Sequence, residues 1–100
     1  MTRWQRVCRE VFDERGPLCE LCGALSRDAH HALIGRMKSK PELDCKENTL
    51  LVCRGCHEDS DEAKRLAWQL LCDRYGREHM VAWLDGLSLI EKPRLEWMER

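Results

Sequence analysis

The chain has 100 residues, with 17 Lys or Arg, 18 Asp or Glu, seven Cys and a formal net charge of −1. This length predicts a single domain over residues 1–100, whose small core would gain substantially from a bound metal. The near-neutral total charge gives by itself no reason to expect nucleic-acid binding. The lack of an apolar leader or of an apolar run of membrane length predicts no membrane partner.

The first half of the chain predicts one helix and two short strands. Residues 2–14 are expected to form a helix that a Gly-Pro pair ends. Its apolar face would consist of Trp4, Val7, Cys8, Val11 and Phe12. Residues 29–34 and 49–52 are β-prone segments, and a basic loop that contains a proline, residues 35–48, joins them.

The second half predicts further helices. One is expected to begin near Cys56 or Ser60 and to end near Tyr75, before Gly76. Its inward-facing side chains would be Ala63, Leu66, Ala67, Leu70 and Leu71. Residues 77–85 predict another short helix, and the segment that follows has no clear preference. The expected fold class is therefore α+β and mainly helical.

Four of the seven cysteines form two Cys-x-x-Cys pairs, Cys19/Cys22 and Cys53/Cys56. Each pair makes a tight turn that presents two thiolates to one ion, and two pairs supply the four ligands of a structural zinc. The odd cysteine count and the paired spacing favour zinc in a reducing cytoplasm over a secreted disulfide framework. Of the other three, Cys8 and Cys72 lie on apolar helical faces and are expected in the core. Cys45 lies in a polar loop and has no predicted role.

Three histidines and one asparagine lie close to these cysteines in the sequence. His30 and His31 are neighbours on a β-prone segment, so their side chains are expected to point to opposite faces. His57 follows Cys56 directly, so a structural zinc would place it facing the hairpin. The amide of Asn48 could cap the loop, position a base or offer an oxygen to a metal. Such groups beside a structural zinc are typical of a hydrolytic metal site.

Basic residues are more frequent in the first part of the chain. Residues 1–57 carry ten Lys or Arg against eight Asp or Glu, whereas residues 58–100 carry seven against ten. Arg36, Lys38 and Lys40 gather in the loop between the strands. Because local patches set the field that a phosphate backbone meets, these three are expected to contact DNA, and a solvated basic loop is the alternative.

The runs AHHA at residues 29–32 and NTLLVCRGCH at residues 48–57 resemble the HNH endonucleases, in the four-cysteine zinc branch common among phage and bacterial nucleases. The resemblance covers residue 19 to about residue 62. It implies a ββα-metal core at about residues 19–75, between the N-terminal helix and a C-terminal helical appendage over residues 77–100. It also implies DNA as the substrate.

By position, the resemblance implies that His31 is the general base, that His30 and His57 bind a catalytic metal ion, and that Asn48 is the central asparagine. Two positions depart from the family pattern, which often has Pro and His there: Ile34 and Asp61. A carboxylate one helical turn after His57 would suit Mg²⁺ or Mn²⁺. The alternative for Asp61 is a solvated helix-start residue, with water completing the metal site.

These observations predict a metal-dependent endonuclease that hydrolyses DNA phosphodiester bonds with a single catalytic Mg²⁺ or Mn²⁺ and a structural Zn²⁺. A neutral His31 would accept the proton of the attacking water while the metal stabilises the leaving oxygen. The expected setting is the bacterial cytoplasm, within a phage or restriction assembly or outside one. The alternative is a zinc-stapled DNA-binding or assembly module whose nuclease activity is weak or lost. The oligomeric state is not predicted.

Overall fold

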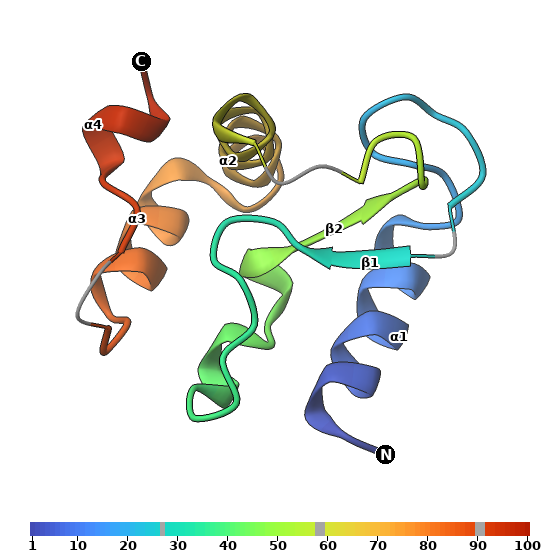
Figure 1. Cartoon of the computed structure of the whole chain (residues 1–100), viewed down its shortest axis with the longest axis horizontal. Coiled ribbons are helices and arrows are strands. Elements are labelled where there is room, and N and C mark those ends of the chain that lie inside the picture. The colour runs from blue at the N-terminus through green and yellow to red at the C-terminus, as the bar shows by residue number, and fades with distance from the viewer. Residues whose placement is uncertain (27, 58–59, 90–91) are drawn as a thin grey trace.

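The two strands of the protein pair with each other, and the helices lie around them. A computed structural model describes residues 1–26, 28–57, 60–89 and 92–100. In chain order the elements are α1 (Arg3–Arg15), β1 (Asp28–His31), two 3₁₀ helices (Pro41–Leu43 and Lys46–Asn48), β2 (Thr49–Val52), α2 (Asp61–Tyr75), α3 (Arg77–Asp85) and α4 (Leu95–Met98). The protein is therefore α+β, as predicted, with about half of its residues in helices and one two-stranded antiparallel sheet (Figure 1).

The hairpin is sandwiched between α1 and α2, which Figure 1 shows below and above it. On β2, Leu50 and Val52 belong to one buried cluster with Ala67 of α2. Side chains alternate along a strand, so the buried Leu51 points to the other face, where α1 contacts β2. Both faces of β2 are thus covered, which explains its uninterrupted run of apolar residues.

The first helix forms almost where it was predicted. Thr2 caps it by accepting a hydrogen bond from the backbone N–H of Gln5 at 3.1 Å, and the Gln5 side chain accepts from the backbone N–H of Thr2 at 2.9 Å. This reciprocal cap satisfies two backbone groups at the helix start. Val11 is fully buried, whereas Phe12, at the edge of the predicted apolar face, remains 40% exposed.

The hairpin is antiparallel and shorter than predicted at its first strand. His30 pairs with Leu50 and His31 pairs with Thr49. The prediction that this strand runs to residue 34 is wrong, because β1 ends at His31. The next residues are held instead by the side chain of Asn48, which binds their backbone groups in place of a second strand. The predicted second strand, residues 49–52, is confirmed.

The helix α2 begins at the later of the two predicted starts. Ser60 caps it by accepting a hydrogen bond from the backbone N–H of Ala63 at 3.1 Å, and the helix ends at Tyr75, before Gly76 with its φ of +94°. The inward orientation predicted for Leu66 is wrong, since this residue is 43% exposed. The buried face of α2 is centred on Trp68 and Leu71 instead, so the apolar stripe is rotated away from Leu66.

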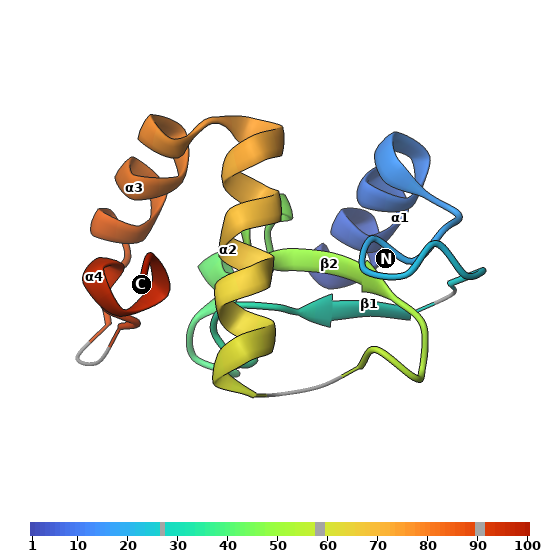
Figure 2. The same ribbon diagram turned by 90° about the horizontal axis from the view of Figure 1, so that it is seen from above.

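The C-terminal helices complete the same core. The predicted helix over residues 77–85 is confirmed as α3, and α4 forms in the segment for which the sequence had no preference. Figure 2 shows α3 and α4 next to each other on one side of α2. Met80 of α3 and Met98 of α4 belong to the buried cluster that also holds Trp68. Within the described ranges, none of the helices has the length and apolar character that a membrane crossing requires.

The ion pair that holds α4 in place makes the stability of the folded protein depend on pH in the acid range. Hydrogen bonds from Arg77 and from the indole of Trp68 lower the pKa of Glu99 to about 2. The folded protein therefore binds fewer protons than the unfolded chain as the pH falls from about 4.3 to about 2, and this stabilisation is lost across that window. We expect Glu99→Gln to lower the melting temperature at neutral pH, and the difference from wild type to vanish near pH 2.

A matched control is Glu96→Gln, which removes the same charge from an exposed position on α4. Thermal melts followed by circular dichroism across this pH range measure both variants. A melting temperature for Glu99→Gln that equals the wild-type value at neutral pH would contradict the role of this ion pair.

Candidate metal centre and active site

The four paired cysteines come together at one end of the hairpin. Their sulfur atoms all lie within 4.8 Å of one another, and those of Cys22 and Cys53 are 3.5 Å apart. A regular tetrahedron with Zn–S bonds of about 2.3 Å has sulfur atoms about 3.8 Å apart. The four side chains therefore fit a single metal ion such as zinc, and all seven cysteines are free thiols rather than disulfides.

Short-range hydrogen bonds shape the two turns that present these sulfur atoms. Cys19 donates its backbone N–H to Ala24 at 2.6 Å, and Gly23 donates to Cys19 at 2.9 Å with a φ of +79° that favours glycine. The second turn closes when Cys56 donates to the carbonyl of Cys53 at 3.0 Å. Each turn is thus formed locally, as the spacing predicts.

Glu20 joins the first turn to the hairpin. Its backbone N–H donates to the carbonyl of Leu51 at 2.9 Å, and its carboxylate accepts from the N–H of Leu51 at 2.8 Å. The other carboxylate oxygen lies 3.6 Å from Arg15, whose side chain is fully buried at the end of α1. Glu20 therefore holds the first cysteine pair beside β2, from which the second pair continues.

The thiols influence one another strongly because they are so close. Burial raises the pKa of Cys19, but hydrogen bonds from the backbone of Cys53, Cys22 and Leu21 outweigh it and lower that pKa to about 6. In contrast, hydrogen bonds with the side chains of Cys22 and Cys53 raise the pKa of Cys56 to about 12. Four thiolates this close would repel one another, and a dication bound among them would offset part of that charge.

The remaining cysteines lie away from this cluster. Cys72 packs against the core, as predicted, and Cys8 is half-buried on α1. Burial raises the pKa of Cys45 to about 11, so its thiol is neutral at physiological pH. Its backbone carbonyl accepts a hydrogen bond from the Thr49 hydroxyl at 2.7 Å. Cys45 therefore contributes to the loop through its backbone.

His30 and His57, the residues expected to bind a catalytic metal, lie side by side. Their ring centroids are 4.3 Å apart and their planes are inclined at 61°. His30 is half-buried on β1, and His57 is exposed just after the second cysteine turn. An open cavity of about 350 Å³ borders His57, lined also by Asp28, Ala29 and Arg54. Two imidazole rings thus lie together at one place on the surface.

His31 points to the other side of the hairpin, as the strand geometry predicted. Its Nε2 atom lies 2.8 Å from Oδ1 of Asp44, and its ring stacks on Trp4 at 3.9 Å with an interplanar angle of 22°. Neither Trp4 nor Asp44 was predicted to take part in the site. A carboxylate in the loop is visible in the sequence, but its contact with His31 depends on how that loop folds.

Asn48 is entirely inaccessible to solvent and uses its whole side-chain amide in hydrogen bonds. Its oxygen accepts from the backbone N–H groups of Leu33 and Ile34 at 3.0 and 2.9 Å. Its nitrogen donates to the carbonyls of Ile34 and Leu43 at 2.8 and 3.1 Å. Of the three roles considered for this residue, these are the contacts of a loop cap.

We expect Asn48→Ala to destabilise the protein by at least about 3 kcal/mol, because four buried backbone groups lose their partners and each such loss costs roughly 1–3 kcal/mol. Urea denaturation measures this change. The matched control is Gln5→Ala, which removes an exposed amide with one backbone contact and should cost roughly 0.5–1.5 kcal/mol. An Asn48→Ala protein as stable as the control variant would contradict the loop-cap role.

Asp61 is the first residue of α2 and is exposed. The expected spacing of one helical turn from His57 does not apply, because His57 precedes the helix and residues 58–59 lie outside the described residues. Among the described residues, the group of three or more closely placed metal-ligating side chains is the four-cysteine cluster. His30, His57 and Asp61 do not form a second such group.

The three basic residues of the loop lie on its surface. Arg36 and Lys38 are exposed and Lys40 is half-buried. Arg54, which sequence reasoning did not single out, adds a further cation beside His57. In comparisons with known proteins, no family model, no curated protein and no solved structure matches this chain.

Proposed function

We propose that the protein is a metal-dependent HNH endonuclease that hydrolyses DNA phosphodiester bonds. The observation that carries this proposal is the contact between His30 and His57, whose ring centroids are 4.3 Å apart. One imidazole comes from the hairpin and the other from the end of the cysteine turn, so the pair supplies two ligands for one divalent cation. The order β1, β2, α2 beside a four-cysteine site also agrees with a ββα-metal core.

In this mechanism His30 and His57 would hold Mg²⁺ or Mn²⁺, with Asp61 or water completing the coordination, and the bound cation would supply Lewis-acid stabilisation of the negative charge that develops during hydrolysis. His31 takes a proton from the water whose oxygen attacks phosphorus. The bond to the 3′ oxygen breaks, and that oxygen gains a proton from solvent. The products are a 5′ phosphate and a 3′ hydroxyl.

The proposed DNA contacts come from the loop between the strands. Arg36, Lys38 and Lys40 supply cations for phosphates that flank the cleaved bond, and such contacts position the duplex without reading its sequence. We place the protein in the bacterial cytoplasm, where reduced thiols remain available to zinc. There it would act within a phage or restriction assembly or outside one.

A second candidate function is a zinc-stapled module that binds DNA, or organises an assembly, without cutting. The observation that favours it is that Asp61 does not join His30 and His57 in a group of three ligands. With two protein ligands, a divalent cation would be held more weakly and would retain more of its water.

A plasmid-nicking assay with zinc-loaded protein separates the two functions. We expect supercoiled DNA to be nicked or linearised when Mg²⁺ or Mn²⁺ is added, and to stay intact when the added metal is omitted. Omitting metal, rather than adding a chelator, leaves the structural zinc in place. His57→Ala should raise the metal concentration needed for half-maximal cleavage, because one of two imidazole ligands is lost.

The matched control is His79→Ala, which removes a half-exposed histidine on α3 that pairs with Glu47. This variant should cleave with the wild-type metal dependence. If wild-type protein binds the plasmid but cuts it with neither metal, the endonuclease proposal fails and the binding module is favoured.

A further inference from the structure

The contact between His31 and Asp44 involves one particular ring nitrogen of the histidine. Nε2 of His31 lies 2.8 Å from Oδ1 of Asp44, and the two side chains are only 11% and 15% exposed. An ionised carboxylate only accepts hydrogen bonds, so Nε2 must donate. A neutral imidazole carries one ring proton, which leaves the lone pair on Nδ1. Limited solvent access strengthens this contact.

Trp4 fixes the plane of the same ring. Its indole stacks on His31 with ring centroids 3.9 Å apart and an interplanar angle of 22°. Rotation of the imidazole out of its plane would break this stacking, and a half-turn about its bond to Cβ would move Nε2 away from Asp44. Trp4 belongs to α1, which lies outside the part of the chain that resembles HNH endonucleases.

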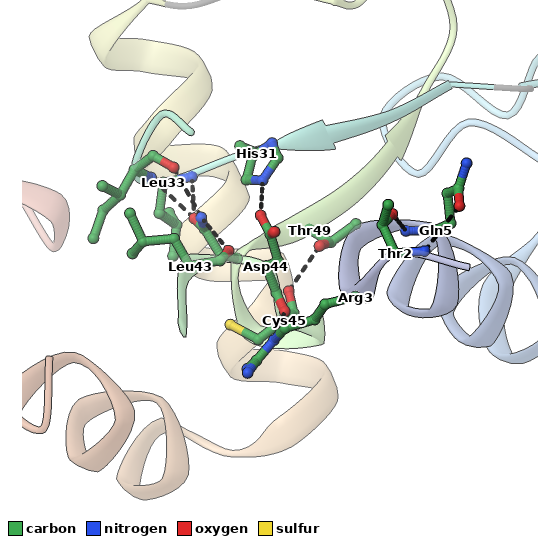
Figure 3. A network of polar contacts seen from close by, with 11 residues as sticks. Thr2, Arg3, Gln5, His31, Leu33, Leu43, Asp44, Cys45 and Thr49 are labelled. Carbon is green, nitrogen blue, oxygen red and sulfur yellow. Dashed lines mark hydrogen bonds and ion pairs between the residues drawn. The ribbon is translucent and has the colours of Figure 1, made fainter. Parts of the chain in front are cut away.

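Asp44 is itself held in place by its backbone. Its carbonyl accepts a hydrogen bond from Nε of Arg3 at 2.9 Å, and its N–H donates to Pro41 at 3.0 Å. The carbonyl of the preceding residue, Leu43, accepts from the buried side chain of Asn48 at 3.1 Å. Figure 3 shows this network from His31 through Asp44 to Arg3 at the start of α1.

We propose that Asp44 and Trp4 are positioning residues for His31, which hold its imidazole in the Nε2–H tautomer and aim the lone pair of Nδ1 toward the attacking water. This inference rests on the proposed function for its catalytic meaning, but the tautomer itself is independent of activity. It gives α1 a role in the site: Arg3 secures Asp44 and Trp4 secures the ring. Asn48 contributes indirectly, because its side chain binds the carbonyl of Leu43, the residue before Asp44.

The tautomer can be measured directly. In protein with ¹⁵N-labelled histidine rings, nuclear magnetic resonance at about pH 8, where histidines are ordinarily neutral, distinguishes a protonated ring nitrogen from an unprotonated one. We expect wild-type His31 to be protonated at Nε2. In Asp44→Asn the amide N–H₂ can donate to Nε2, so the proton should move partly or wholly to Nδ1. Glu42→Gln, which removes a charge from the same loop, should leave His31 unchanged.

Cleavage measurements test the consequence. Asp44→Asn should lower kcat by at least about 10-fold, and by up to about 10⁴-fold as for other general-base histidines that lose their carboxylate partner, with KM for DNA and zinc content unchanged. Trp4→Leu should also lower kcat, whereas Trp4→Phe, which keeps an aromatic face, should restore most of it. Thermal melts of each variant verify that it is folded.

Three results would overturn the proposal: wild-type His31 protonated at Nδ1, an unchanged tautomer in folded Asp44→Asn, or a changed tautomer with full kcat. If the wild-type protein cleaves no DNA, the endonuclease function fails separately. The tautomer measured in wild type and in Asp44→Asn then decides alone whether Asp44 positions His31.

Discussion

Cys53→Ser is expected to abolish the folded state, because it removes one of four ligands from the site that joins the ends of the hairpin segment. A structural zinc contributes roughly 10–16 kcal/mol in zinc-finger peptides, which is as large as the whole stability of most small domains, roughly 5–15 kcal/mol. Wild-type protein should purify with about one zinc per chain, and removal of that zinc should likewise abolish the folded state. Elemental analysis and circular dichroism measure these outcomes.

Cys72→Ser is the matched control for this prediction. It makes the same chemical change at a half-buried position on α2, away from the cluster, and should retain the zinc and the fold. Metal-free wild-type protein with an unaltered melting temperature would show that the four cysteines do not hold a structural ion.

The second large effect concerns catalysis. His31→Ala is expected to reduce DNA cleavage by roughly 10²–10⁴-fold, the usual loss when a general base is removed. Zinc content should not change, since His31 is not part of the cysteine cluster, and DNA affinity should stay near the wild-type value. Single-turnover cleavage of a labelled duplex, compared with binding measured by fluorescence anisotropy, separates these effects.

His79→Ala again serves as the control, because its ring pairs with Glu47 on another part of the surface. Full activity of a folded His31→Ala protein would show that another group accepts the proton of water. That result would remove the role of His31 while leaving the endonuclease proposal to the nicking assay.

Local features of the protein were predictable from the sequence because each depends on neighbouring residues. Two residues between paired cysteines make a tight turn wherever they occur, and the sulfur atoms of the two turns do come within 4.8 Å of one another. The helices α1 and α3 and the strand β2 follow from short-range patterns of apolar residues and from helix ends. The opposite orientation of His30 and His31 follows from strand geometry alone.

Packing decided which apolar residues of α2 are buried. Leu66 fits the predicted stripe but is exposed, whereas Trp68 is buried and its indole donates to Glu99 at 3.1 Å. The neighbours that cover Trp68 come from α3 and α4. No pattern in the sequence predicts α4. The helical period of apolar residues defines the buried face of a helix only to within about one residue. The helices that pack against it determine where the centre of that face lies.

The contacts of the candidate site were likewise decided by the tertiary structure. The sequence identified His30, His31, Asn48 and His57 as candidate site residues. It did not show that the rings of His30 and His57 would meet, or that Asn48 would bind four backbone groups. The contacts of His31 with Trp4 and Asp44 join residues from α1, the hairpin and the loop. The sequence by itself thus determined the two cysteine turns, whose geometry is local. The meeting of these turns and the surroundings of His31 depend on long-range packing that no short pattern encodes.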